Sequence, residues 1–445
     1  MTAAIVKTGS VAAPMLYVST RGGSPAVSIS AAIAAGLAPD GGLYVPESLS
    51  RLDASAFDPH GTLADTAATL LAPFFAGDAL ADELPAICAE ALNIDTPLRA
   101  LPQANAHVLE LFHGPTAAFK DVGARFLAAC MRRLPRTDAR PLTILVATSG
   151  DTGAAVGAAF HHQPGLRVVI LYPDGKVSPR QAHQLGCFGD NVHALRVAGR
   201  FDDCQRMVKA ALSDTALQAN VPLTSANSIS LGRLLPQMSY YAHAALAWWR
   251  EHGEPLNVIV PTGNLGNAMA CLWVREMGLP IGRVELACNA NATLPDYFAG
   301  ADYQPRAAII TLANAMDVGA PSNVERLQWT FPDERVMRQL LQVHSVSDED
   351  IQQTISIHAS KHGEVFCPHT ATAVHWLDQL RAAGDTSAWT IVATAHPAKF
   401  DSVVEPLIGH PVDVPDSLAA MLARPAVAEP LAADDDALKA WLLSR

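Results

Sequence analysis

The sequence predicts an α/β protein built on open parallel sheets covered by helices, with a mainly helical region at its N-terminus. From about residue 101 onward, short apolar runs rich in β-forming residues alternate with segments of helical spacing. Runs that are apolar throughout are typical of parallel strands buried on both faces. The chain has 445 residues, of which 50% are hydrophobic and 17% charged. A chain of this length suggests about three domains, and its high hydrophobic content excludes a disordered protein.

The first hundred residues are predicted to form alanine-rich helices after a short glycine-rich opening at 21–24. A mainly apolar run follows over 27–37. The sequence Pro-Asp-Gly-Gly at 39–42 is a turn signal, and it leads into a short predicted strand at 43–45.

The rest of the chain contains four predicted strands, which are Thr143–Ala147, Arg167–Tyr172, Asn257–Val260 and Thr390–Ala393. Helices are predicted to end at Phe160, to span 203–217 and to start at Ala268. The tail after Pro411 is rich in Pro, Ala and Asp, and is expected to be a loop followed by a short terminal helix.

The composition narrows the functional classes. Lys and Arg number 31 against 43 Asp and Glu, and the net charge of −12 argues against a general nucleic-acid or anionic-membrane binder. A small anionic ligand stays compatible, because a few placed cations bind one locally. Seven scattered cysteines without a CxxC pair argue against a disulfide framework or zinc ribbon. Without a secretory pattern or a run of ~18 apolar residues, we expect a cytoplasmic protein.

The segment from His113 to Asp121 (HGPTAAFKD) contains a candidate reactive lysine. Thr116 is suited to cap a helix that begins near Ala117, which would place Lys120 in its first turns beside apolar residues. Burial and the positive end of a helix dipole both lower the pKa of a lysine, as a Schiff-base-forming lysine requires. The pattern also fits an ordinary surface lysine paired with Asp121.

Two loops between a predicted strand and helix have the composition of anion sites. In the first, small residues, helix-start N–H groups and the hydroxyls of Thr148, Ser149 and Thr152 suit a carboxylate or a phosphate. Asp151 in this loop is expected to point away from an anion, or to meet a cation or hydroxyl. The loop also fits a plain capped helix start.

The second loop has glycines that permit close approach to a phosphate at a helix start, and consists of Gly263, Asn264, Leu265, Gly266 and Asn267. It lacks the lysine of a Walker A loop and the GxGxxG pattern of dinucleotide sites. A tight turn that only connects strand to helix is the alternative interpretation.

Two further segments carry polar groups. Asn227 and Ser228 precede a predicted helix with Arg233, and such a set binds a phosphate dianion. Thr394 directly follows a strand, at the edge where open parallel sheets bind ligands, and its hydroxyl could meet a ring nitrogen. The local pattern alone favours the alternatives, which are a capped helix with a surface arginine and a threonine that merely ends its strand.

No metal site is predicted. The pair His161-His162 fits a solvated helix end, and no third ligand lies at metal-binding spacing in the sequence. Cys367 and His369 are neighbours in sequence, which is not the geometry of a catalytic triad.

Taken together, these segments resemble the longer type of threonine synthase, a family of pyridoxal-phosphate enzymes with the fold of the tryptophan synthase β subunit (fold type II). The matching segments, in order, are YVSTRG, LAPDGGLYVPE, LELFHGPTAAFKDVGARFLA, ATSGDTGAAV, SANSISLGRLLPQ, VPTGNLGN and ATAHPAKF. The resemblance implies an N-terminal region (1–100), a mobile region with the cofactor lysine and substrate loop (101–250), a large cofactor-phosphate domain (251–410) and a C-terminal tail (411–445).

The resemblance also implies which residues bind the cofactor, pyridoxal 5′-phosphate. Lys120 matches the Schiff-base lysine, the loop 263–267 matches the cofactor phosphate loop, and Thr394 matches the hydroxyl that faces the pyridine nitrogen. Asp151 stands where shorter relatives carry an asparagine near the 3′-oxygen of the cofactor.

The resemblance also implies two substrate-binding sets. The loop that binds the substrate carboxylate would consist of Thr148, Ser149 and Thr152. The site for the substrate phosphate would consist of Asn227, Ser228 and Arg233. The implied reaction converts O-phospho-L-homoserine and water to L-threonine and phosphate by γ-elimination and β-replacement. The alternatives are a lyase or dehydratase with the same cofactor, a non-catalytic binder of phosphorylated ligands, and a nucleotide-binding protein. No nucleic-acid or membrane partner is expected.

Overall fold

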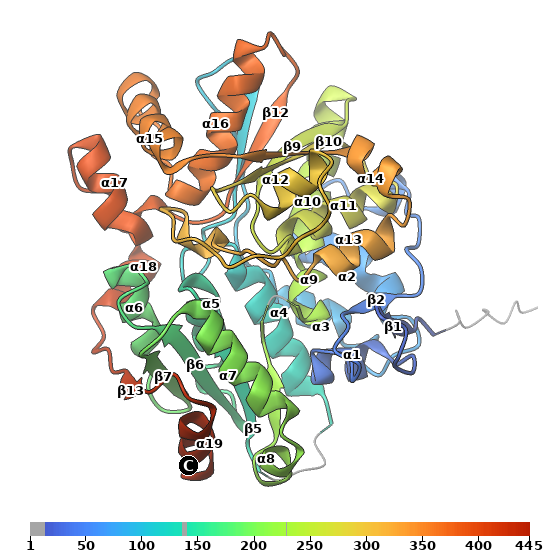
Figure 1. Cartoon of the computed structure of the whole chain (residues 1–445). Coiled ribbons are helices and arrows are strands. Elements are labelled where there is room, and N and C mark those ends of the chain that lie inside the picture. The colour runs from blue at the N-terminus through green and yellow to red at the C-terminus, as the bar shows by residue number, and fades with distance from the viewer. Residues whose placement is uncertain (1–13, 136–139, 228) are drawn as a thin grey trace, which may run out of the picture.

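Two open sheets, each covered by helices, form the protein (Figure 1). The computed structural model describes residues 14–135, 140–227 and 229–445. The predicted α/β class with parallel sheets is confirmed. Among the described residues, no helix is both long and apolar enough to cross a membrane.

The larger sheet has six strands in the order β11-β10-β9-β12-β4-β3, all parallel except the antiparallel edge strand β3. Its strands are β3 (Leu98–Ala100), β4 (Ala106–Glu110), β9 (Leu256–Pro261), β10 (Ile281–Cys288), β11 (Leu341–Ser345) and β12 (Trp389–Ala393). Because β4 pairs with β12, the larger sheet combines strands from well-separated parts of the chain.

The smaller sheet has five parallel strands in the order β13-β7-β6-β5-β8. They are β5 (Leu142–Ala147), β6 (Leu166–Pro173), β7 (Val192–Val197), β8 (Leu223–Ser225) and β13 (Glu429–Leu431). The tail after Pro411 is therefore more than the expected loop and terminal helix, because it supplies β13 as an edge strand. Glu429 and Pro430 in this strand gave no β-strand signal.

Successive residues of a strand point to opposite faces, and the core follows this alternation. In β9, Val258 and Val260 pack on the side of α10 and α11, whereas Ile259 packs on the side of α16. In β6, Ile170 packs with α5, whereas Leu171 packs with α7 and α19. Apolar residues on both faces explain why these strands were continuous apolar runs in the sequence.

The helices lie between and outside the sheets (Figure 1). Those of the first half of the chain are α1 (Ile29–Ala35), α2 (Leu63–Leu71), α3 (Leu84–Ala91), α4 (Lys120–Arg133), α5 (Asp151–Phe160), α6 (Pro179–Gly186), α7 (Phe201–Ser213) and α8 (Thr215–Asn220). Those of the second half are α9 (Leu231–Leu234), α10 (Gln237–His252), α11 (Gly266–Glu276), α12 (Thr293–Phe298), α13 (Val324–Thr330), α14 (Glu334–Leu340), α15 (Asp348–His362), α16 (Pro368–Ala382), α17 (Asp401–Ile408), α18 (Asp416–Leu422) and α19 (Asp435–Leu443).

Most of the predicted elements agree with these bounds to within one or two residues. The helix expected over 203–217 is two helices, because the carboxylate of Asp214 accepts a hydrogen bond from the N–H of Leu217 and caps α8. The short strand expected at 43–45 is β2 (Tyr44–Pro46), which pairs with β1 (Tyr17–Ser19) in an antiparallel ribbon.

The C-terminal helix offers a matched test of packing. Leu438 is fully buried in the cluster under α7, while Leu443 in the same helix is 50% exposed. We expect Leu438→Ala to lower the free energy of unfolding by about 2–5 kcal/mol, because it leaves a cavity. Leu443→Ala should change it by no more than about 0.5 kcal/mol. Urea unfolding followed by circular dichroism measures both, and equal effects would contradict the role of α19 as a core element.

Candidate active site

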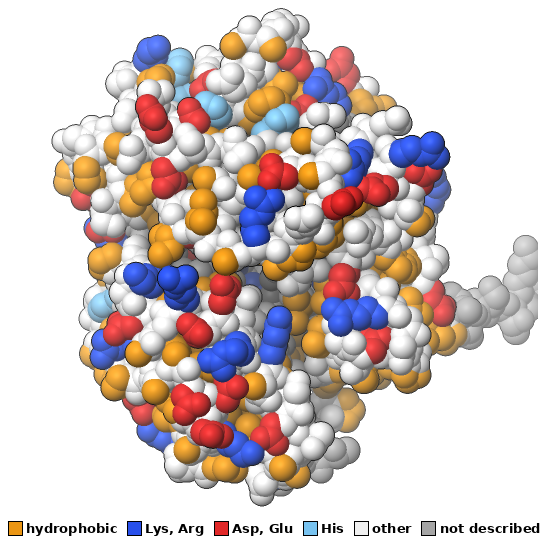
Figure 2. Space-filling view, in the orientation of Figure 1, with side chains coloured by type: hydrophobic (Ala, Val, Ile, Leu, Met, Phe, Trp, Pro, Cys, Tyr) orange, Lys and Arg blue, Asp and Glu red, His pale blue; other side chains and the backbone are white. Residues whose placement is uncertain are grey.

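A cavity of about 970 Å³ opens where strands of the two sheets end. It is lined by the segments that follow β5, β8, β9 and β12, together with the N-terminal residues of α4. Ligand sites of open parallel sheets lie at such carboxyl ends. Figure 2 shows a hollow in the middle of this face, with lysine and arginine side chains at its edge.

The turn before α4 sets the position of Lys120. Asp121 accepts hydrogen bonds from the backbone N–H and the hydroxyl of Thr116, at 2.8 and 2.7 Å, and Ala117 has a left-handed φ of 55°. The sequence expectation that Thr116 caps a helix from Ala117 is therefore wrong, because its hydroxyl donates to Asp121 instead. α4 begins at Lys120 without a side-chain cap.

The environment of Lys120 favours its neutral amine. The carboxylate of Asp121, the next residue in the sequence, accepts hydrogen bonds from Thr116. The alternative of a surface lysine paired with Asp121 is therefore excluded. Lys120 is partly exposed, toward the cavity, and burial lowers the pKa of its ammonium to about 8. The positive charges of Arg233 and Lys399 lower it further, whereas Asp151 acts in the opposite direction.

Asp151 is held by a buried ion pair. The Lys399 ammonium, which is 0% exposed, lies 3.1 Å from the Asp151 carboxylate and donates a 2.6 Å hydrogen bond to the carbonyl of Thr116. Gln181 from α6 donates a further hydrogen bond of 3.0 Å to Asp151. Burial alone would raise the pKa of Asp151, but Lys399 and Lys120 hold it below its usual value. The expectation that Asp151 meets a cation is confirmed.

The turn 263–267 has backbone N–H groups that donate no hydrogen bond within the described residues. Leu265 has a left-handed φ of 64°, and α11 starts at Gly266 without a side-chain cap. The N–H groups of Gly266, Asn267 and Ala268 have no acceptor among the described residues, as expected for the first turn of a helix. No carboxylate lies in the turn. Such a turn suits a phosphate.

Asn267, which lines the cavity, has one side-chain donor without a partner in the described residues. Tyr240 and Tyr241 from α10 both donate to its side-chain oxygen, at 2.5 and 2.9 Å. Its side-chain nitrogen is buried and has no hydrogen-bond partner among the described residues. The two tyrosines therefore fix which end of the amide is free to meet an anion.

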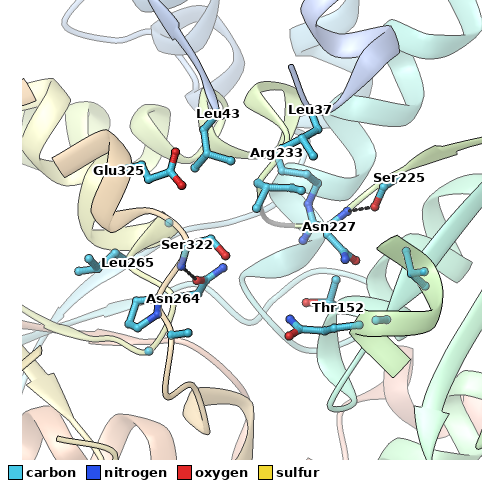
Figure 3. Close-up of a pocket in the computed structure, with 18 of the residues that line it drawn as sticks. Leu37, Leu43, Thr152, Ser225, Asn227, Arg233, Asn264, Leu265, Ser322 and Glu325 are labelled. Carbon is cyan, nitrogen blue, oxygen red and sulfur yellow. Dashed lines mark hydrogen bonds between the residues drawn. The ribbon is translucent and has the colours of Figure 1, made fainter. Parts of the chain in front are cut away.

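Arg233 and Asn227 form a second polar wall (Figure 3). Arg233 is 2% exposed and donates through Nη1 to the carbonyl of Ala226, while its Nε has no partner in the described part of the chain. Burial lowers the pKa of Arg233 to about 10, so it stays charged at neutral pH. Asn227 is held through its N–H by the hydroxyl of Ser225. Ser228, which the sequence added to this set, lies outside the described residues.

The first predicted loop contributes in two ways. The oxygen of Thr148 accepts hydrogen bonds from the N–H groups of Gly150 and Gly153, at 3.0 and 2.9 Å, so it also shapes the loop. Ser149 and Thr152 line the cavity, as does Thr394 at the end of β12.

The cavity thus brings together every predicted site residue that the structure describes. Sequence reasoning missed Lys399 and His369. Burial lowers the pKa of His369 to about 4, and the neutral ring accepts a hydrogen bond of 3.0 Å from the N–H of Ala315. Lys399 lies in the segment HPAKF, but no local pattern reveals that its ammonium reaches a carboxylate 248 positions earlier in the chain.

An amine of lowered pKa that lines the same cavity as a phosphate-binding turn fits a cofactor that carries an aldehyde and a phosphate. The model described as "Pyridoxal-phosphate dependent enzyme" matches residues 90–397, more than half of the chain. Fold and cavity define an enzyme of this class, and pyridoxal phosphate is its cofactor. Two further models, for the N terminus and the C-terminal part of threonine synthase, match residues 16–92 and 370–442.

Several threonine synthases are similar to this chain over nearly its whole length. The threonine synthase of Haemophilus influenzae is 37% identical over 94% of this chain and 97% of its own length. The crystal structure of threonine synthase from Escherichia coli superposes with a TM-score of 0.88 at 35% identity, covering 97% of this chain and all of that one. The structure of a threonine synthase from Brucella melitensis with bound pyridoxal phosphate superposes with a TM-score of 0.86 at 33% identity. It covers 97% of this chain and 99% of that one. The chain belongs to the threonine synthase family.

The buried pair of Lys399 and Asp151 predicts a strong dependence on its counter-ion. Lys399→Met should lower the free energy of unfolding at pH 7 by about 3–5 kcal/mol, because it leaves a buried carboxylate without its ion-pair partner. Adding Asp151→Asn to this variant should restore part of the loss. Urea unfolding measures both.

Lys439→Met is the matched control, because Lys439 pairs with Asp214 at a partly exposed position. It should leave the unfolding midpoint nearly unchanged. If the two lysine variants behaved alike, the buried pair would have no special role.

Proposed function

We propose that this chain converts O-phospho-L-homoserine and water to L-threonine and phosphate. The observation that carries this proposal is the presence of two anion-binding walls in one cavity. One wall is the turn 263–267, and the other contains Arg233 and Asn227 (Figure 3). A phosphorylated cofactor needs one such site, and a phosphorylated substrate needs a second one.

The cofactor would be held by residues of both sheets. Lys120 would bind its aldehyde carbon, since the low pKa of about 8 provides a nucleophilic amine. The turn 263–267 would bind its phosphate through backbone N–H groups and the free nitrogen of Asn267. Thr394 would face the pyridine nitrogen, and Asp151 would lie near the 3′-oxygen.

When bound, pyridoxal phosphate supplies an electron sink for the charge left at Cα of an amino acid. The protein has to move protons at the right atoms. Lys120 is the candidate base for the Cα proton, because its amine is neutral for much of the time near pH 8. The carboxylate of Asp151 cannot compete for this proton, because Lys399 and Lys120 stabilise its ionised form.

The substrate would be oriented by its two anionic ends. Thr148, Ser149 and Thr152 would donate to its carboxylate at the start of α5, where the helix dipole favours negative charge. Arg233 and Asn227 would meet its phosphate, because both line the cavity and Arg233 carries a positive charge. Holding both ends places the reacting carbons near Lys120.

The direct test is incubation with O-phospho-L-homoserine while threonine and phosphate are measured together. We expect equal amounts of both with the native protein. Lys120→Ala should lower the rate by roughly a thousandfold or more, because it removes both the cofactor bond and the base. Unphosphorylated L-homoserine is the control substrate and should give no threonine. A keto acid with ammonia in place of threonine would identify a lyase of the same cofactor class instead.

The lowered pKa of Lys120 predicts a pH dependence for cofactor uptake. The neutral amine is the reactive form, so the rate at which cofactor-free protein binds pyridoxal phosphate should rise about tenfold per pH unit below 8 and level off above it.

Asp151→Asn should move this profile to lower pH, because the Asp151 charge raises the pKa of Lys120. Comparing variant and native protein at each pH cancels the titration of the cofactor itself. The double variant with Lys399→Met loses one charge of each sign and should shift less. A shift of the single variant to higher pH would contradict the assignment.

A further inference from the structure

We propose that His161, His162 and Asp190 form a binding site for a divalent transition-metal ion of the zinc class, away from the catalytic cavity. His161 and His162 follow the last residue of α5, and Asp190 lies in the turn before β7. The three ligand atoms all lie within 4.8 Å of one another. This inference does not rest on the proposed function.

Two of the three distances between ligand atoms match those around a four-coordinate ion. Asp190 Oδ2 lies 3.4 Å from Nε2 of His161 and 3.5 Å from Nδ1 of His162. Ligand atoms at about 2.1 Å from an ion, in tetrahedral directions, are about 3.4 Å apart. Three protein ligands leave one position for water. Two imidazoles with one carboxylate favour zinc or cobalt over magnesium or calcium, which prefer oxygen ligands.

The backbone around the three ligands is fixed by one side chain. Asn191, next to Asp190, donates a 2.9 Å hydrogen bond to the carbonyl of Phe160 and accepts one of 2.9 Å from the N–H of His162. It therefore holds the residues on both sides of His161. A site whose ligands are already held in place loses less entropy when it binds an ion.

Within the described part of the chain, the ligand atoms are not taken up by other partners, and the site is open on one side. Nε2 of His161 makes no hydrogen bond with a described residue. The side chains of His162 and Asp190 are 68% and 65% exposed, which leaves an entry path for the ion.

Some of the surrounding charges favour the binding of a cation and others oppose it. His161 is the C-cap of α5, where the negative end of the helix dipole attracts a cation. Arg424 lines the same surface pocket and its positive charge opposes one. The cysteines do not compete, because all seven are buried.

The pair His161-His162 lacks a third ligand nearby in the sequence, because Asp190 lies 28 residues after His162 and only the fold brings it close. The ten residues of α5 span about 15 Å, so the ion would sit at the far end of the helix from Asp151. It would join the end of α5 to the turn before β7, and we expect it to affect stability and leave the reaction rate unchanged.

Calorimetric titration of the untagged holoenzyme with zinc chloride tests the proposal. We expect one equivalent to bind, and cobalt chloride to give the intense visible absorption of a four-coordinate ion. Asp190→Asn and His162→Asn should each weaken zinc binding by at least about tenfold. Both native residues have a left-handed φ, of 50° and 59°, which asparagine tolerates, so these variants should fold.

His60→Asn is the control, because His60 is an exposed histidine outside the cluster. It should bind zinc like the native protein, and Arg424→Gln should bind it more tightly. Zinc, but not magnesium, should raise the melting temperature of the native protein and not that of Asp190→Asn. Undetectable zinc binding, or equal binding by the native protein, Asp190→Asn and His162→Asn, would overturn the site.

Discussion

The architecture of the cavity depends on the ammonium of Lys399. It is completely buried, and it joins three segments that are far apart in the chain: its own loop after β12, the turn at Thr116 and the loop with Asp151. A buried charge costs free energy unless it is paired and hydrogen-bonded, and here both conditions are met. Asp151 begins α5, which packs on the smaller sheet, and Lys399 follows β12 of the larger sheet. The ion pair therefore also fixes the two sheets relative to each other.

This arrangement separates two kinds of positive charge. Lys120 lies on the wall of the cavity, where burial weakens its hold on a proton, whereas Lys399 lies behind the wall in contact with a carboxylate. The charge of Lys399 lowers the pKa of Lys120 without occupying the space that a ligand needs. The charge of Arg233 also lowers this pKa. The pKa of one amine therefore reflects residues from both sheets.

Much of the fold followed from local patterns. Continuous apolar runs identified β5, β6, β9 and β12, because strands buried on both faces leave a simple signal. The strand β13 was missed, since an edge strand of three residues with a proline carries no such signal. The predicted start of α4 was less accurate. The hydroxyl of Thr116 donates to Asp121 and does not cap a helix, and α4 begins at Lys120. Sequence alone does not show whether such a hydroxyl bonds to a helix N-terminus or to another side chain.

For the site, motifs gave the residues that line the cavity but not those behind it. Gln181 and Lys399 support Asp151 from other elements, and their roles arise only from tertiary contacts. The tyrosines that orient Asn267 come from α10, where they looked like ordinary core residues.

The burial of every cysteine has a practical consequence. Desolvation raises the pKa of Cys88, Cys204, Cys271 and Cys288 to about 12, so their thiols are both inaccessible and protonated at neutral pH. A thiol-modifying dye would then react only when a segment of the native fold opens. The chain thus carries a built-in set of reporters distributed from α3 to α16, and labelling kinetics followed by peptide mapping would rank its regions by how often they open.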